Sequence, residues 1–257
     1  MQISHATRPS PTPGRVNEDL VVSGPGWAFV LDGATPAPGA ATGCRHDVPW
    51  LVRRLARALA TRLTLTAAER PLPEILAGAI GELRDAHAGA CDLGNPDSPS
   101  STAAIARAGG TTLDYLVLCD SPILLRHTGG RLTVVADDRL ARLPGGPPYA
   151  SELIRARRNQ PGGFWVASTD PTAAYQAVCG QAELTELTDA ALFTDGVTRL
   201  AEWYGYPWPV ILDYLRDQGP DALIDLVRAA ERGYPHPRHK QHDDATVAHL
   251  RWPSKPR

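Results

Sequence analysis

Acidic residues stand beside apolar runs at five places along the 257-residue chain. A carboxylate at the end of a strand can face solvent while the sheet holds it rigidly. Hard divalent cations such as Mg²⁺ and Mn²⁺ bind several oxygen ligands, and two of them about 3.5–4 Å apart can activate a bridging water and neutralise a phosphoryl oxygen. The residues are Glu18 and Asp19 in NEDLVV, Asp32 in FVLDGAT, Asp120 in VLCDSPILL, Asp195 in LFTDGVT, and Asp243 and Asp244 in HDDATVAHL.

Each of these motifs taken alone also fits an ordinary structural role. Asp-Gly is the commonest hairpin dipeptide, so Asp32-Gly33 and Asp195-Gly196 both fit a tight turn. The pair Asp243-Asp244 fits a strand cap. The hypothesis of a metal site therefore depends on the ordered set and not on any single motif.

Composition and charge exclude several classes of protein. The chain is 43% hydrophobic and 21% charged, which excludes a disordered tail protein. Its net charge of −2 provides no basic field for nucleic acid or for an anionic membrane. Lys240 and Lys255 are the only lysines beside 24 arginines, which indicates a GC-rich genome.

The cysteines and the first residues suggest a compartment. Cys44, Cys91, Cys119 and Cys179 show no CxxC pair and no spacing that we interpret as a zinc site. Residues 1–15 are polar and proline-rich without an apolar leader, and no run of about 18 apolar residues exists. The sequence therefore predicts a cytoplasmic protein with reduced thiols.

Hydrophobic periodicity predicts the elements that must position the acidic residues. The spacing is helical over the stretches from Leu51 and from Leu72, and it changes to strand-like after the loop at 92–101. Helices are expected at 51–63, 72–83, 150–158 and 206–231 (interrupted at 219–220), and strands at 27–31, 102–108, 113–119, 123–127, 132–136, 164–168, 190–194 and 245–250.

This order of elements predicts an α+β fold. The alternating β-α-β units of a parallel sheet are absent, so antiparallel sheets covered by helices fit better. The turns between the four strands of 102–136 are short, which predicts an antiparallel meander. We expect a single domain over residues 1–257, with a core at about 14–252.

The motifs in their order resemble the PPM-type family of metal-dependent protein phosphatases, also called protein phosphatase 2C. They are NED, an apolar strand ending in DG, SSTA at 100–103, DS after a strand, a second DG, and D-x-x-T-V near the end, and together they span 17–250. The resemblance implies an α-β-β-α sandwich of two packed antiparallel sheets flanked by helices, with Mg²⁺ or Mn²⁺ in a cleft at one edge.

The resemblance also implies the roles of the core residues. Asp32 matches the aspartate that bridges two metals, and Gly33 matches the glycine whose carbonyl binds one of them. Asp195 and Asp243 match the carboxylates of the second metal. Asp32, Asp195 and Asp243 are thereby the catalytic residues, which hold the hydroxide that attacks phosphorus.

The outer positions are implied in the same way. Glu18 and Asp19 match the acidic pair that holds metal-bound waters, and Asp120 matches an aspartate that can help bind a third, weaker metal. Arg199 stands where the family often has a further aspartate, which argues against that third metal. A cation at position 199 could instead attract substrate phosphate.

Other departures from the pattern concern substrate binding and loop shape. Arg15 is expected to grip the phosphate although it stands three residues before Glu18 and not four, and Arg8 is the second candidate. Ala34 replaces a histidine that some members use as a general acid. The motifs GDS and GST appear as 119–121 (CDS) and 100–102 (SST), so each lacks its glycine.

The implied activity is hydrolysis of phosphoserine and phosphothreonine in proteins by direct attack of a metal-bridging hydroxide, without a phosphoenzyme. The partners are then a phosphorylated protein substrate and an opposing Ser/Thr kinase. Two alternatives stay open: a catalytically weak or inactive regulatory module with the same fold, and a phosphatase of a small phosphoester.

A histidine-rich loop precedes the last acidic pair. His236, His239 and His242 recur at every third residue, which could bind a transition metal, line the cleft, or form a polar surface loop. These three interpretations remain open from the sequence.

Overall fold

The computed structural model describes residues 1–37, 39–66, 69–87, 89, 91–234 and 240–252. Two antiparallel five-stranded sheets form its centre, as the resemblance implied. In order across sheet A lie β1 (Gln2–Arg8), β12 (Ala245–Arg251), β11 (Leu187–Phe193), β8 (Ile123–His127) and β9 (Leu132–Val135). In order across sheet B lie β10 (Val178–Glu183), β7 (Thr112–Leu118), β6 (Ala103–Gly109), β3 (Trp27–Leu31) and β2 (Leu20–Gly24). A short pair, β4 (Gly33–Ala34) and β5 (Ser100–Ser101), stands beside them.

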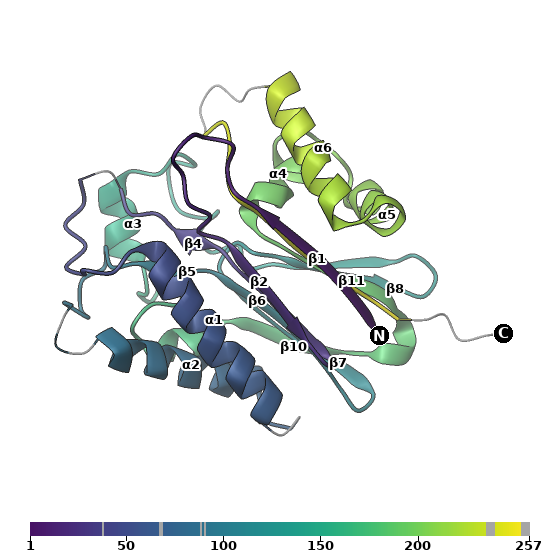
Figure 1. Cartoon of the computed structure of the whole chain (residues 1–257), viewed down its shortest axis with the longest axis horizontal. Helices are drawn as coiled ribbons and strands as arrows, with labels where there is room; N and C mark the ends of the chain where they lie inside the picture. Colours follow the sequence, from purple (N-terminus) through teal and green to yellow (C-terminus); the bar gives the residue numbers. More distant parts are fainter. Residues whose placement is uncertain (38, 67–68, 88, 90, 235–239, 253–257) are drawn as a thin grey trace.

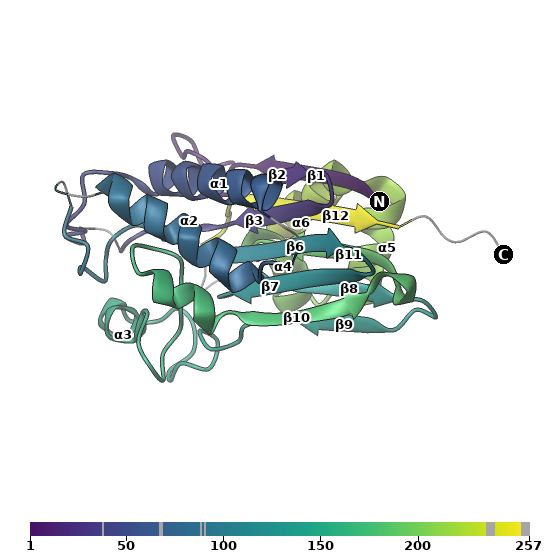
Figure 2. The same ribbon diagram turned by 90° about the horizontal axis from the view of Figure 1, so that it is seen from below.

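Helices cover the outer faces of both sheets (Figures 1 and 2). The helices α1 (Val48–Leu65) and α2 (Leu72–His87) pack on sheet B, and α4 (Asp195–Glu202), α5 (Trp208–Gln218) and α6 (Pro220–Gly233) pack on sheet A. A third apolar core lies between the sheets. The remaining helical elements are α3 (Ser151–Arg157) and the short 3₁₀ turns at Pro171–Gln176 and Leu184–Glu186.

The sequence explains the start of α1. The Asp47 side chain accepts a hydrogen bond from the Trp50 N–H at 2.8 Å, which caps the first turn, and Pro49 fits a position where no N–H is needed. Leucines at the expected helical spacing then bury one face against sheet B. The cap places the helix start three residues before the first leucine.

Several expected elements differ in the structure. The strands of 102–136 are not one meander, because β7 belongs to sheet B and β8 to sheet A, so the chain crosses between the sheets at 120–122. The segment 164–168 forms only isolated bridges and no strand. The strands β1, β2 and β10 and the helix α4 were not predicted, because their apolar patterns are short or broken by polar residues.

The register of the strands brings the acidic residues to one end of the sandwich. Leu20 pairs with Leu31, so the start of β2 lies beside the end of β3. Val247 pairs with Phe193, so the start of β12 lies beside the end of β11. Antiparallel pairing therefore gathers residues 18–19, 32, 195 and 243 at neighbouring strand ends.

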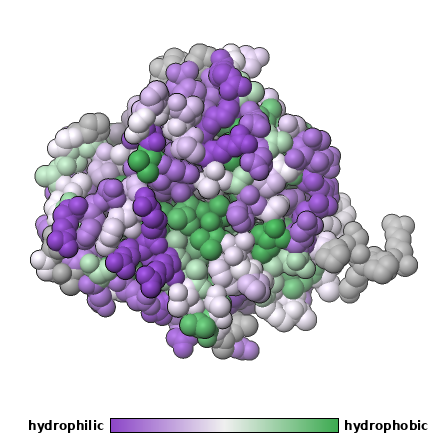
Figure 3. All heavy atoms as spheres, in the orientation of Figure 1, coloured by the Kyte–Doolittle hydropathy of each residue, from purple (hydrophilic) through white to green (hydrophobic). Residues whose placement is uncertain are grey.

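The edge strands β1 and β2 lie side by side on one face of the molecule. Apolar side chains gather over the middle of this face, and hydrophilic side chains surround them (Figure 3). No helix in the part of the chain that the structure describes is both long and apolar enough to cross a bilayer.

Gly196 provides a test of the close packing that positions α4. A Cβ at this residue would lie 1.8 Å from the Asp244 carbonyl oxygen, so we expect Gly196→Ala to lower the free energy of unfolding by about 1–3 kcal/mol. Gly81 in α2 is the matched control, because its Cβ would meet nothing within 4 Å. Gly81→Ala should raise the free energy of unfolding by about 0.5–1 kcal/mol. Urea unfolding of both variants measures the difference, and equal stabilities would contradict it.

Candidate metal centre

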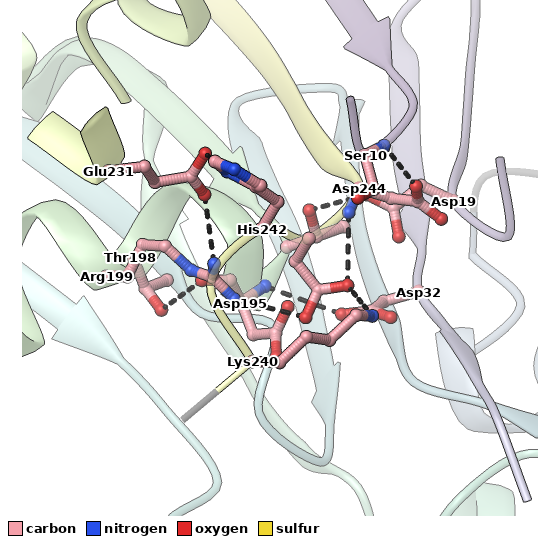
Figure 4. A network of polar contacts seen from close by, with 12 residues as sticks. Ser10, Asp19, Asp32, Asp195, Thr198, Arg199, Glu231, Lys240, His242 and Asp244 are labelled. Carbon is pink, nitrogen blue, oxygen red and sulfur yellow. Dashed lines mark hydrogen bonds and ion pairs between the residues drawn. The ribbon is translucent and has the colours of Figure 1, made fainter. Parts of the chain in front are cut away.

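Three carboxylates converge from separate elements at the end of the sandwich. Asp32 follows β3, Asp195 is the first residue of α4, and Asp243 lies shortly before β12. The Asp195 backbone N–H points at Oδ2 of Asp32 at 3.4 Å. Figure 4 shows the Asp32 and Asp195 side chains beside one another. The structure therefore brings together the three residues expected to be catalytic.

Burial and mutual repulsion dominate the electrostatics of this group. Burial raises the pKa of Asp32 well above its usual value, and the charges of Asp195 and Asp19 raise it further. Burial likewise raises the pKa of Asp195, and Asp243 and Asp120 add to the effect. The charged forms of these carboxyls are therefore disfavoured, and the metal-free group keeps protons that exposed carboxyls would lose.

Gly33 is fixed by a close approach of the backbone. Its N–H donates to the Glu18 carbonyl at 3.1 Å. A Cβ at this position would lie 2.4 Å from Cγ1 of Val48 and 2.7 Å from the Glu18 carbonyl oxygen. Only glycine fits here. Because Gly33 has no side chain, Val48 at the start of α1 can pack directly against the backbone that follows β3.

Glu18 and Asp19 adjoin the three carboxylates from the other side. Asp19 is buried and accepts a hydrogen bond from the Thr194 hydroxyl at 2.8 Å, while burial raises the pKa of its carboxyl to about 7. Glu18 is half-buried and accepts a hydrogen bond from the Thr35 hydroxyl. Burial raises the pKa of Glu18, and the charge of Arg15 lowers it.

Asp244 has a structural role next to the cluster. Its carboxylate accepts hydrogen bonds from the backbone N–H groups of Ser10 and Glu18, both at 2.7 Å. Figure 4 shows the contact with Ser10. It thereby ties the segment that carries Glu18 and Asp19 to the start of β12. A charged acceptor with two N–H donors is among the stronger hydrogen-bonding arrangements in proteins.

Asp120 lies in the crossing between the two sheets. Burial raises the pKa of its carboxyl, and repulsion from Asp137 and Asp243 contributes. The preceding residue, Cys119, has a φ of 67°, so the backbone keeps a left-handed conformation although the family's glycine is missing. The Cys119 N–H donates to Asp137 at 2.9 Å.

Asp137 was missed by the sequence analysis. It is buried, orients the loop before Asp120, and is itself paired with Arg139 at 2.6 Å. The sequence pattern that identified the other acidic residues also applies to Asp137, because this residue follows the apolar run of β9.

Arg199 is a buried partner of the cluster and not a substrate ligand. The residue is 1% exposed, and its guanidinium donates to Glu231 at 2.9 Å and to Asp243 at 3.1 Å and lies 4.4 Å from the centre of the Trp203 ring. The idea that Arg199 attracts substrate phosphate is therefore wrong, because both ends of its fork are already engaged inside the protein.

Glu231 in α6 connects the cations behind Asp243. It accepts a hydrogen bond from Arg228 at 2.9 Å and contacts His242 Nδ1 at 2.8 Å. Figure 4 shows Glu231 beside His242. Lys240 forms an ion pair with Asp243 on another side. His236 and His239 of the predicted loop lie outside the described residues.

The two arginines considered for phosphate differ in their surroundings. Arg8 pairs with Asp221 at 2.9 Å and with Asp225, so α6 engages its guanidinium. Arg15 is exposed and near enough to Glu18 for its charge to act on that carboxyl. Ala34 lies in β4 opposite Ser100 and has no side chain for acid catalysis.

The donor set fits hard divalent cations. Carboxylate and carbonyl oxygens are the ligands that Mg²⁺ and Mn²⁺ prefer, and this group offers them from Asp32, Gly33, Asp195 and Asp243. A cation would also relieve the repulsion that raises the pKa of Asp32 and Asp195.

Comparison with solved structures shows the same fold elsewhere. The Mycobacterium tuberculosis serine/threonine phosphatase PstP/Ppp is 16% identical over 96% of this chain and 97% of its own, with a TM-score of 0.61. A complex of the PstP catalytic domain with two manganese ions matches at 16% identity over 96% of both chains, with a TM-score of 0.62. Stp1 from Staphylococcus aureus is 14% identical over 98% of this chain and 95% of its own, with a TM-score of 0.64.

At these identities the structural likeness shows a shared fold. No curated protein sequence matches the chain. A sequence profile described as protein phosphatase 2C matches residues 14–228, which is most of the chain and includes Asp32 and Asp195. The chain therefore belongs to the protein phosphatase 2C family, the metal-dependent serine/threonine phosphatases.

Proposed function

We propose that the acidic cluster holds two Mg²⁺ or Mn²⁺ ions and that the chain hydrolyses phosphoserine and phosphothreonine in proteins directly. The observation that supports this most is the convergence of Asp32, Asp195 and Asp243, with a backbone N–H of one 3.4 Å from the carboxylate of another. When bound, such a pair of ions lowers the pKa of water and neutralises charge on the phosphoryl oxygens.

The chain's own residues fix the ligands in place. Asp32, the Gly33 carbonyl, Asp195 and Asp243 would hold the ions, with Glu18 and Asp19 behind them. Thr194 orients the Asp19 carboxyl, and Arg199 orients Asp243. Such supporting contacts keep ligand geometry constant, which metal sites require.

The hydroxyls beside the cluster favour direct hydrolysis over a phosphoenzyme. Ser121 is fully buried and shares a 2.6 Å hydrogen bond with the Thr102 hydroxyl. A buried hydroxyl engaged in this way is poorly placed to attack a substrate phosphate. An attacking water needs no such side chain.

Arg199 supports two ions rather than three. A third ion would need a carboxylate beside Asp120, and position 199 supplies a buried cation that is already paired with Glu231. The charge of Arg199 also lowers the pKa of Asp195, so it partly neutralises the cluster from behind.

The partners follow from the family. The substrates are phosphorylated proteins, and we propose that a Ser/Thr kinase opposes the enzyme. We also propose a single domain over residues 1–257, which is supported by the pairing of β1 with β12. The cytoplasmic location stays a prediction from the sequence.

Replacing either central carboxylate should abolish most activity. We expect Asp32→Asn and Asp195→Asn to lower kcat/KM by about a hundredfold or more, because a bound ion contributes several kcal/mol to the transition state. Asp85→Asn is the matched control, since Asp85 lies exposed on α2. Release of phosphate from a phosphothreonine peptide with added Mn²⁺ measures the effect.

The same assay separates the alternatives. A wild type as inert as Asp32→Asn would contradict the enzymatic proposal and favour a regulatory module. Faster turnover of para-nitrophenyl phosphate and other small phosphoesters than of phosphopeptides would indicate a small-molecule phosphatase.

Arg15 should contribute to substrate binding. We expect Arg15→Ala to raise KM for a phosphopeptide by about tenfold with a smaller change in kcat, because a charge-assisted hydrogen bond contributes roughly 1.5–3 kcal/mol. Arg8→Ala should leave KM unchanged, because α6 engages that side chain. Steady-state kinetics of both variants distinguish them, and a KM effect confined to Arg8→Ala would refute the assignment.

The raised pKa values predict how pH acts on the metal-free protein. Asp19, with a pKa of about 7, and Asp32 and Asp195 keep protons in the folded state that the unfolded chain loses above about pH 4. The folded state then binds more protons, so its stability should fall as pH rises from about 5 to about 8. Added Mn²⁺ should raise Tm more at the higher pH.

Thermal unfolding in the presence of a chelator measures this dependence. Asp32→Asn removes one of the repelling charges, so its Tm should depend less on pH. A wild-type Tm that rises over this range would show that the carboxyls are not held protonated.

A further inference from the structure

A second group of potential metal ligands lies away from the acidic cluster. Cys44 and His46 precede α1, His87 ends α2, and Cys91 follows it. One ligand atom from each lies within 4.8 Å of all the others. The start of α1 and the end of α2 lie at the same end of this antiparallel helix pair (Figure 1).

The distances resemble those of a tetrahedral site. A zinc ion with Zn–S near 2.3 Å and Zn–N near 2.0–2.1 Å separates sulfur and nitrogen ligands by about 3.5 Å, and two sulfurs by about 3.8 Å. Nδ1 of His46 lies 3.7 Å from Sγ of Cys44 and 3.5 Å from Sγ of Cys91. The two sulfurs lie 2.8 Å apart, so they would separate by about 1 Å on binding an ion.

The imidazole of His87 is already oriented for coordination. It is buried, and its Nδ1 bonds to the Leu83 carbonyl at 2.8 Å, which leaves Nε2 as the ligand atom. A ligating histidine almost always donates its other ring N–H to such an acceptor, because this fixes the tautomer.

Trp50 holds both imidazoles. The His46 ring stacks on it with centroids 3.7 Å apart, and the His87 ring meets it edge-on at 4.7 Å. Coordination through Nδ1 of His46 places the ring proton on Nε2, so the contact from Arg45 at 3.4 Å must move. Arg45 is exposed, and this movement is free of packing constraints.

We propose that Cys44, His46, His87 and Cys91 form a structural zinc site. Thiolate and imidazole ligands suit zinc, whereas Mg²⁺ and Mn²⁺ prefer oxygen. Four protein ligands leave no open position for a substrate, so the site is structural and not catalytic. On binding, the two thiols release their protons to solvent.

The proposed ion would join segments that hydrogen bonds already draw together. The Asp92 N–H donates to the Gly43 carbonyl at 2.8 Å, and the Ser98 hydroxyl donates to the Thr42 carbonyl at 3.1 Å. Val48, two residues after His46, lies where it limits residue 33 to glycine. The zinc site would therefore fix the start of α1 beside Gly33.

The sequence analysis overlooked this site. Its ligands occur as Cys-x-His and His-x₃-Cys, about 40 residues apart, which matches no zinc pattern that we searched for. The packing of α1 against α2 brings the two halves together.

Cobalt substitution tests the proposal on the wild-type protein. The protein is purified without a histidine tag, reduced, stripped of metal and titrated with Co²⁺. We expect one equivalent to produce the intense visible bands of tetrahedral Co²⁺ and a near-ultraviolet thiolate charge-transfer band, and Zn²⁺ to abolish both. Co²⁺ bound by the oxygens of the acidic cluster absorbs weakly and has no thiolate band.

Variants assign the signal to the four residues. Cys44→Ser and Cys91→Ser should each lose at least half of the intensity of the thiolate band, whereas Cys179→Ser, at an exposed cysteine elsewhere, should keep it. Asp32→Asn should also keep it, so loss of phosphatase activity and loss of zinc binding are distinguishable. Zn²⁺ should raise the Tm of Cys179→Ser more than that of Cys44→Ser, because only the acidic cluster remains to bind the ion in Cys44→Ser.

Two results would overturn the proposal. Wild-type protein that gives no thiolate band, or a band that keeps its full intensity in Cys44→Ser, excludes this ligand set. Protein purified without reductant that has lost two thiols, and whose tryptic map links Cys44 to Cys91, would identify a disulfide in place of the ion.

Discussion

The repulsion among a few partly buried carboxylates is the constraint on which this structure depends. Burial and the neighbouring charges both raise the pKa of Asp32 and Asp195, so holding the two together opposes folding in the absence of a cation. The register of the two sheets imposes the arrangement, because the ends of β3 and β11 are fixed by backbone pairing along the whole strands. Positive charge compensates in part, because Arg199 bonds to both Glu231 and Asp243. Lys240 pairs with Asp243 from another side. The interactions that stabilise the core thus offset the unfavourable proximity of these carboxylates. The same proximity provides the ligands for a divalent cation.

The sequence predicted the parts of the fold that local patterns determine. The Leu-rich spacing of α1 and the apolar run of β3 are strong signals, and both elements were confirmed within a few residues. The assignment of strands to sheets depends on long-range pairing, which periodicity does not report. The short turn at 120–122 has the composition of a hairpin, yet Ser121 is fully buried there and the chain changes sheets. The strand β10 alternates weakly and lies at an edge, so its pattern resembles a loop.

The sequence likewise predicted some residues of the candidate site and not others. Aspartates that directly follow or precede apolar runs could be located, and the family resemblance put them in order. The partners that orient them could not, because Glu231 lies in α6 and reaches Asp243 through Arg199, a contact between residues far apart in the sequence. Arg199 was interpreted from its charge alone, which suggested an exposed role toward phosphate. Its burial under Trp203 reverses that interpretation, because a guanidinium whose two terminal nitrogens bond to Glu231 and Asp243 inside the protein is not accessible to a substrate.

The two proposed metal sites differ in the softness of their ligands. Because of this difference, each site is expected to prefer a different metal ion. Oxygen ligands at Asp32 and Asp195 favour Mg²⁺ or Mn²⁺, which exchange readily, while the sulfurs of Cys44 and Cys91 favour zinc. The two sites are also connected by one short segment of the chain. The chain runs from Gly33 through Cys44 and His46 to Val48, and Val48 returns to pack on Gly33. An ion that fixes residues 44 and 46 therefore closes this loop and limits the movement of the Gly33 carbonyl. Through this loop, a structural ion outside the reaction can determine how rigidly the catalytic oxygens are held.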